Sequence, residues 1–228
     1  MKKLALVMST ALLTAPLAAQ AAPAAGWTGP YVGVNAGYGL GNVTIDDQDC
    51  NISCSSQSFS PSGFTIGGTA GYNYQMGSAV LGVEGDYNYI DAKHDVVTDW
   101  PSHYKVQFKS YGTVRVRAGL AVDRALVYAT AGLGIVDRNV LAEQVSGSAA
   151  PSYGFVQNKT AVGVAAGVGT EVAISARIRA KLEYLYIGVP ADNNIRDQFN
   201  TNCASHTHCN YGVKSDLNVV RVGVNYAF

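Results

Sequence analysis

The sequence predicts an all-β protein, specifically an eight-stranded antiparallel up-and-down transmembrane β-barrel. Three observations support this fold class. Segments in which apolar residues alternate with glycine or polar residues recur eight times along the chain. The connections between these segments alternate between long polar loops and short turns. The chain contains 14 Tyr and 25 Gly, whereas only 14% of its residues are charged, which is typical of a barrel in a membrane.

The first two strands are expected at 27–40 and 64–74. In both, valine, isoleucine, alanine and aromatic residues alternate with glycine, threonine and asparagine, so that one face is apolar. The serine-rich segment 41–62 between them is expected to form a long loop. A tight turn at 75–78 ends the second strand.

The third and fourth strands are expected at 79–89 and 104–120, with a second loop at 91–103 between them. The third strand places Glu84 and Asp86 on the face opposite its apolar residues. The fourth strand is the longest alternation in the chain. Its apolar face is expected to hold Tyr104, Val106, Phe108, Val114, Val116, Ala118 and Leu120, opposite Lys105, Gln107, Lys109, Thr113, Arg115 and Arg117.

The fifth, sixth and seventh strands are expected at 126–135, 162–172 and 178–186. The fifth and sixth oppose valine, leucine and alanine to a face that is mostly glycine. The seventh opposes apolar and tyrosine residues to charged ones. A third loop is expected at 137–158, and a short turn at 174–176 joins the sixth and seventh strands.

The eighth strand, 216–228, reads DLNVVRVGVNYAF and follows a fourth loop at 188–215. Its apolar face ends in the aromatic residue Phe228. Because long and short connections alternate around eight strands, both termini fall on the side of the short turns. This is the layout of an outer-membrane barrel with short periplasmic turns and long outer loops, so both termini are expected to be periplasmic.

The apolar stripe of all eight expected strands contains no charged residue. A Lys or Arg there would cost about 2–4 kcal/mol at the bilayer midplane, whereas a stripe that faces water would tolerate it. Aromatic residues at the strand ends are placed as two interfacial girdles. These are Trp27, Tyr74, Tyr226 and Phe228 near the periplasmic rim, and Tyr38, Tyr87, Tyr89 and Tyr184 near the outer rim.

The opposite stripe carries acidic and basic residues in similar numbers. An eight-stranded barrel leaves an interior just wide enough for side chains, so these groups are expected to form a buried ion-pair network that fills the lumen. The predicted members are Glu84, Asp86, Arg115, Arg117, Glu171, Arg179, Lys181, Glu183 and Arg221.

The first residues have the form of an export signal. Lys2 and Lys3 precede an apolar run, and Ala19-Gln20-Ala21 has the small-x-small form that a signal peptidase reads. We therefore expect 1–21 to be a signal peptide and 22–228 to form the barrel domain. Loss of the two lysines leaves 14 basic and 16 acidic residues, and this slight negative charge argues against nucleic acid as a partner.

Six stretches resemble a known family: WTGPYVGVNAGYG, LGVEGDYNY, GTVRVRAGLA, LVYATAGLG, AKLEYLY and VRVGVNYAF. The chain resembles the opacity-like, OmpA-type outer-membrane surface antigens of alphaproteobacteria, a porin-like family that includes haemin-binding members. The resemblance implies that the loops carry the partner and that Tyr226 and Phe228 belong to the signal read by the barrel-assembly machinery. It also implies roles in envelope integrity, antigenicity and adhesion.

The fourth loop contains the sharpest local motif, Cys203-Ala-Ser-His206-Thr-His208-Cys209. Neutral imidazoles at His206 and His208 are suited to haem iron or a transition metal. The simpler interpretation is a disulfide-closed loop with two incidental histidines, and no cofactor is then expected. His94 and His103 of the second loop are further candidate ligands.

The four cysteines favour two disulfides, because an exported chain meets an oxidising compartment. Proximity favours Cys50 with Cys54 and Cys203 with Cys209, although four cysteines allow three pairings and a bridge between the first and fourth loops stays possible. A zinc site of four thiolates is disfavoured by the irregular spacing.

The expected function is that of an outer-membrane surface protein with a structural and surface-interaction role. Its partners would be outer-membrane lipid and host-surface or envelope molecules bound by four extracellular loops. Haem or metal binding and a small diffusion pore are the alternatives. No enzyme activity is expected, because Ser-His-acid chemistry would need a histidine on the lipid-facing rim of a strand and all four histidines fall in predicted loops. Glu84 and Asp86 are better explained as ion-pair partners beside Arg115 and Arg117 than as a catalytic pair.

Overall fold

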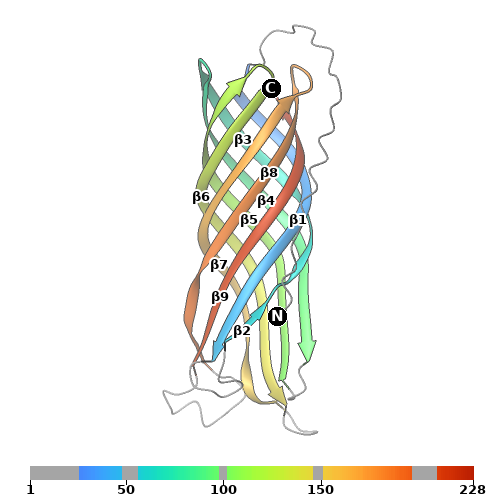
Figure 1. Ribbon diagram of the computed structural model, residues 1–228, viewed down its shortest axis with the longest axis vertical. Coiled ribbons are helices and arrows are strands. Elements are labelled where there is room, and N and C mark those ends of the chain that lie inside the picture. The colour runs from blue at the N-terminus through green and yellow to red at the C-terminus, as the bar shows by residue number, and fades with distance from the viewer. Residues whose placement is uncertain (1–25, 48–55, 98–101, 146–150, 197–209) are drawn as a thin grey trace, which may run out of the picture.

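The computed structural model of the chain describes residues 26–47, 56–97, 102–145, 151–196 and 210–228, which form one antiparallel sheet closed into a ring (Figure 1). The eight long strands follow one another around the ring in chain order, and pairing of the last with the first closes it. The strands are β1 (Gly29–Asp47), β2 (Gln57–Phe59), β3 (Ser62–Met76), β4 (Ala79–Val97), β5 (Ser102–Val122), β6 (Ala125–Val145), β7 (Pro151–Ala173), β8 (Ile178–Arg196) and β9 (Asn210–Ala227). The predicted eight-stranded barrel is confirmed, with the short β2 added beside β1.

The three short connections lie at one end of the barrel, at the top of Figure 1. We call this the turn end. The turn after β3 uses Gly77 at φ +62° and the turn after β5 uses Asp123 at φ +52°. These are left-handed conformations that glycine and aspartate tolerate. The last residue also lies here, because the Phe228 amide donates to the Pro30 carbonyl at 3.1 Å.

The opposite end, which we call the loop end, differs from the sequence prediction. Much of the second, third and fourth expected loops is strand, because β4 and β5 reach Val97 and Ser102, and β6 and β7 reach Val145 and Pro151. β8 likewise continues to Arg196. The polar composition that suggested loops belongs to hairpins whose outer faces lie beyond the apolar band. No helix long and apolar enough to cross a membrane occurs among the described residues.

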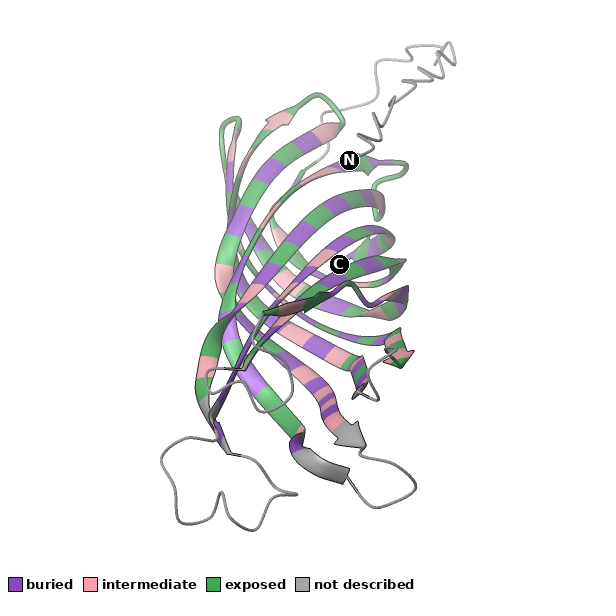
Figure 2. Cartoon of the chain, turned by 60° about the horizontal axis from the view of Figure 1, so that its bottom comes forward, coloured by how far each residue is buried: buried purple, intermediate pink, exposed green. Residues whose placement is uncertain are grey.

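Buried and exposed residues alternate along each strand, as the bands in Figure 2 show. Towards the turn end the outward residues form an apolar band around the barrel. Exposed members of this band come from all eight long strands: Val34, Ile66, Val83, Val116, Leu133, Val164, Leu182 and Val222. The charge-free stripe predicted from the sequence is therefore the outer surface of the barrel.

Towards the loop end the pattern inverts. The outward residues of β4 and β5 become charged, with Asp91, Lys93 and Lys105 exposed, while the inward residues become apolar. They form one large buried cluster: Val43, Ile45, Phe59, Ile90, Ala92, Tyr104, Val106, Phe108, Tyr111, Val136, Val140, Ala142, Phe155, Ala161, Ala165, Leu185, Ile187, Val189, Ile195, Tyr211, Val213, Leu217 and Val219. This half of the barrel therefore has the water-facing exterior and apolar core of a soluble protein.

A β-bulge in β5 explains one incorrect prediction. The register against β6 shifts between Phe108 and Ser110, so that Lys109 is an extra residue. The extra residue reverses the faces of the strand on either side of it. Phe108 is therefore 1% exposed inside the barrel, although the uninterrupted alternation placed it on the same face as the outward residue Val114.

The wall divides into two sheets at the loop end. The β7–β8 ladder stops at Val164 and Gly188, although both strands continue, and β2 pairs with β1 alone within the described residues. One sheet is β4–β5–β6–β7 and the other is β8–β9–β1–β2. Ring contacts join them across the core, with centroids 5.0 Å apart for both Phe59–Tyr104 and Phe155–Tyr211.

Candidate functional site

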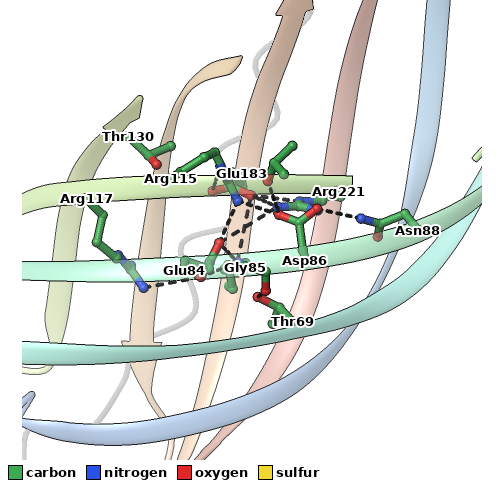
Figure 3. A network of polar contacts seen from close by, with 12 residues as sticks. Thr69, Glu84, Gly85, Asp86, Asn88, Arg115, Arg117, Thr130, Glu183 and Arg221 are labelled. Atoms are coloured by element: carbon green, nitrogen blue, oxygen red, sulfur yellow. Dashed lines mark hydrogen bonds and ion pairs between the residues drawn. The ribbon is translucent and has the colours of Figure 1, made fainter. Parts of the chain in front are cut away.

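The interior of the apolar band is filled by charged side chains, which Figure 3 shows pointing towards one another from β4, β5, β8 and β9. All nine residues predicted for the lumen are buried. They reach the interior because each lies on the inward phase of a strand whose outward phase faces lipid. Eight of them join one set of ion pairs, and the ninth, Arg179, lies apart.

Arg115 is the central cation of this network. Its Nη2 donates to Glu84 Oε1 at 2.6 Å and to Asp86 Oδ2 at 2.8 Å, and its Nη1 donates to Glu183 Oε1 at 3.0 Å. Lys181 Nζ approaches Glu84 Oε1 at 2.9 Å from β8. Because guanidinium presents several donors in a fixed plane, one arginine holds three carboxylates from two strands together.

Asp86 lies on the loop-end side of this centre. It accepts hydrogen bonds from Arg221 Nη2 at 2.9 Å, Thr113 Oγ1 at 2.7 Å and Asn88 Nδ2 at 2.8 Å. A carboxylate that accepts this many hydrogen bonds, two of its donors being cations, is well compensated for its burial.

On the turn-end side, Arg117 continues the network. Its Nη2 donates to Glu171 at 2.8 Å, and its Nη1 donates to the Tyr31 hydroxyl at 2.9 Å. Tyr31 in turn donates to Glu84 at 2.7 Å. The Arg117 guanidinium also lies 3.8 Å from the centroid of the Tyr128 ring, within cation–π range.

Trp27 corrects the predicted periplasmic girdle. It is fully buried inside the barrel, with the Arg179 guanidinium 4.5 Å from its ring, and Arg179 Nη2 donates to the Gly26 carbonyl at 2.8 Å. Trp27 and the buried Tyr31 are four residues apart, so the alternation of inward and outward residues places both side chains inside the barrel. The other predicted girdle residues are exposed: Tyr38, Tyr74, Tyr87, Tyr89, Tyr184, Tyr226 and Phe228.

The aromatic pair at the end of the chain packs as expected of surface residues. Tyr226 and Phe228 both lie on the outer face, with ring centroids 5.2 Å apart in an edge-to-face arrangement. Their role as an assembly signal stays a prediction.

The predicted ligand residues divide into two groups. Cys50, Cys54, Cys203, His206, His208 and Cys209 lie outside the described residues, so the disulfides and the haem or metal site stay predictions. His94 and His103 lie on β4 and β5, which corrects their assignment to a loop. Among the described residues no cluster of three or more His, Cys, Asp or Glu side chains is arranged to hold a metal.

His103 instead joins three strands at the loop end. Its Nδ1 lies 3.0 Å from Glu143 Oε1 on β6, and its Nε2 lies 2.7 Å from Asp95 Oδ1 on β4. These hydrogen bonds to Glu143 and Asp95 raise the pKa of the imidazole above its usual value, because the charged ring donates to both carboxylates. Lys105 lies on the far side of Asp95, with its Nζ 3.8 Å away.

Sequence reasoning missed Arg138, because 137–158 was expected to be a loop. The structure places it inside the barrel on β6, where it is fully buried and its Nη1 donates to Ser215 Oγ at 2.6 Å. Tyr31 and Tyr128 were also not recognised as members of the network. The alternation along their strands predicted that both side chains point inwards. Their hydrogen bonds could not be predicted, because these depend on which carboxylate faces each tyrosine.

Comparison with known proteins gives concordant results. A family model described as an outer membrane protein beta-barrel domain matches residues 9–228. The 31 kDa outer-membrane immunogenic protein of Brucella melitensis is 32% identical over 231 residues, covering 95% of this chain and 91% of that protein. The 25 kDa outer-membrane immunogenic protein of Brucella abortus is 28% identical, covering 93% and 84%. Among solved structures, the outer membrane protein OprG from Pseudomonas aeruginosa has a TM-score of 0.47 at 13% identity, covering 88% of this chain and 96% of that one.

Proposed function

The chain belongs to the outer membrane protein beta-barrel domain family, and from this membership we propose that it acts as a surface-interaction protein whose contacts are made by the loop end. It is an outer-membrane β-barrel protein with immunogenic outer-membrane homologues. In the proposed orientation the loop end faces outwards and both termini face the periplasm.

One observation carries this proposal: the strands extend beyond the apolar band at the loop end and carry a charged exterior there. Lys93 and Asp91 of this exterior are paired at 2.6 Å on β4, and the interior of the loop end is a packed apolar core. Loops positioned by a rigid scaffold are the usual carriers of binding function. The ion pairs around Arg115 and this apolar core fill the interior, which supports a role at the surface in preference to conduction.

The orientation is tested by inserting an epitope tag at either end of the barrel. One insertion lies between Val145 and Pro151 at the loop end, and the other lies between Asp123 and Arg124 at the turn end. Antibody should label intact cells that carry the first tag only, while both tags should react after the outer membrane is permeabilised. Labelling of the second tag on intact cells would reverse the proposed orientation.

The interaction role is tested by adhesion of intact cells to host-cell monolayers. Cells that express the native chain should adhere more than cells with an empty vector. Replacement of Lys93, Lys105 and Lys109 by glutamine should reduce the difference, because it removes exposed charge from the loop end. The matched control is Arg124→Gln with Arg177→Gln at the turn end, which should adhere like the native chain. Equal adhesion of native and empty-vector cells would count against the proposal.

A further inference from the structure

A buried cation near the loop end, Arg138, has no acidic partner among the residues that the structure describes. Arg138 is 0% exposed, and within the described part of the chain it forms no salt bridge. Its Nη1 donates to Ser215, but its Nε has no hydrogen-bond partner among the described residues. Buried charges are normally paired, so Arg138 is unusual.

Arg138 lies behind the place where the barrel wall lacks backbone pairing. On β6 it is paired with Lys159 of β7, and its hydrogen-bond partner Ser215 on β9 is paired with Val189 of β8. The Arg138–Ser215 hydrogen bond therefore spans, from inside, the two strands that separate beyond Gly188.

Polar side chains, in place of a backbone ladder, join β7 to β8 at this position. Lys159 Nζ donates to Asp192 Oδ2 at 2.6 Å, and Gln157 Nε2 donates to the same oxygen at 3.1 Å. The Lys159 side chain is 49% exposed and that of Asp192 is 22% exposed, so water reaches this contact. Gln157 Oε1 is buried and has no partner among the described residues. The bridge is therefore accessible from outside and incompletely satisfied inside.

We propose that Arg138, Ser215 and Lys159 form a binding site for a phosphate group, with Asp192 occupying its outer side when no phosphate is bound. Among the described residues, the two cations Arg138 and Lys159 lie near one carboxylate, that of Asp192, which leaves one positive charge for an incoming anion. A phosphate that takes the place of Asp192 on Lys159 meets the guanidinium of Arg138 and the hydroxyl of Ser215 behind it. Guanidinium, ammonium and hydroxyl donors are the groups that bind phosphate oxygens in proteins.

The site lies at the level where the apolar band ends, so a phosphate group could reach it from water or from a lipid headgroup. On the outer face of β6 the apolar band ends at the exposed Ile135, and the next outward residue is Asp137. Arg138 follows directly, so the site lies at the border between apolar surface and water. Phosphate can arrive there in solution or as the headgroup of a lipid, and the chemistry recognised is the same.

The first test is calorimetric titration of the full chain with inorganic phosphate, after refolding in dodecyl maltoside, a detergent that contains no phosphate. The native chain should bind saturably. Arg138→Met should bind at least tenfold more weakly, and Lys159→Gln should bind several-fold more weakly. Asp192→Asn should bind more tightly, because it removes the competing carboxylate. The control Lys214→Gln alters an exposed lysine beside Ser215 that points away from the site, and it should bind like the native chain.

The second test repeats the titration in dodecyl maltoside micelles that also contain phosphatidic acid. If a lipid headgroup occupies the site, the apparent affinity for inorganic phosphate should fall in the native chain and the unfolding midpoint should rise, with no rise in Arg138→Met. If only soluble phosphate is bound, both values should match those in dodecyl maltoside alone.

Two outcomes would overturn the proposal. One is no saturable binding by the native chain in the first test and no midpoint rise in the second. The other is equal affinity in all variants. If Arg138→Met does not fold, the opposite shifts expected for Lys159→Gln and Asp192→Asn decide the matter, because both side chains are partly exposed.

Discussion

Arg221 on the last strand lies directly opposite Glu183 on β8, and its Nε donates to Glu183 Oε2 at 2.7 Å. The same guanidinium donates through Nη2 to Asp86 on β4. One residue of the closing strand thus contacts carboxylates on strands from both halves of the chain. The ion-pair network therefore depends on ring closure and also stabilises it.

Arg221→Met should destabilise the barrel by about 3–5 kcal/mol, because it leaves two buried carboxylates without one of their cations. The measurement is urea unfolding of the refolded barrel in lipid vesicles, followed by tryptophan fluorescence and by heat-modifiable gel mobility. Lys214→Gln on the same strand is the matched control and should lie within about 0.5 kcal/mol of the native chain, because Lys214 is exposed. A similar effect of both substitutions would contradict the network.

Leu133→Arg should cost about 2–4 kcal/mol, because Leu133 is 60% exposed on the outer face of the apolar band, where a charge would enter lipid. Vesicle unfolding measures this cost. The control Lys105→Arg places the same side chain outside the band, and it should leave the unfolding free energy unchanged.

Phe108→Ala should cost about 3–5 kcal/mol, since the bulge at Lys109 turns this ring into the apolar core of the loop end. Val114→Ala on the same strand should cost much less, because Val114 is 71% exposed on the outer face. Comparison of their unfolding free energies tests the reversal of faces. Equal costs would favour the uninterrupted alternation that the sequence alone suggests.

The loop end should lose stability as the pH rises through the pKa of His103. This pKa is raised in the folded barrel, chiefly by the hydrogen bond to Glu143 and then by that to Asp95. A raised pKa means that the stabilisation is fully present below the unfolded value near 6.5 and is lost above the folded value. NMR titration of the imidazole and unfolding between about pH 5.5 and 8.5 measure the effect.

The His103→Gln variant provides the control for this pH dependence. It keeps a polar side chain between Asp95 and Glu143 but cannot titrate, so its unfolding free energy should vary less with pH than that of the native chain. Equal pH profiles for the two would assign the dependence to other groups.

The strands of the apolar band could be predicted because the residue type at each position there depends on whether its side chain faces lipid or the lumen. Lipid excludes charge from every outward position, so Val116 and Val222 could be assigned to the outer face without knowledge of their neighbours. Glu84, Arg115 and Glu183 could be assigned to the lumen for the complementary reason. Their individual pairings could not be predicted, because strands that are adjacent in space bring together residues distant in the chain.

Sequence by itself determined the strand number, the membrane-facing stripe and the charged lumen residues inside the apolar band of this outer-membrane barrel. A strand in lipid has one apolar face, so this signal is local. Only the tertiary structure decided the length of the loop-end hairpins, the reversal at Lys109 and the burial of Arg138 beside Ser215. Beyond the apolar band a strand has water on one side and an apolar core on the other. The alternation of polar and apolar residues does not by itself show which face of the strand points into the core. The register of the strands and the closure of the ring determine which face points inwards, and both depend on contacts between residues that are distant in the chain.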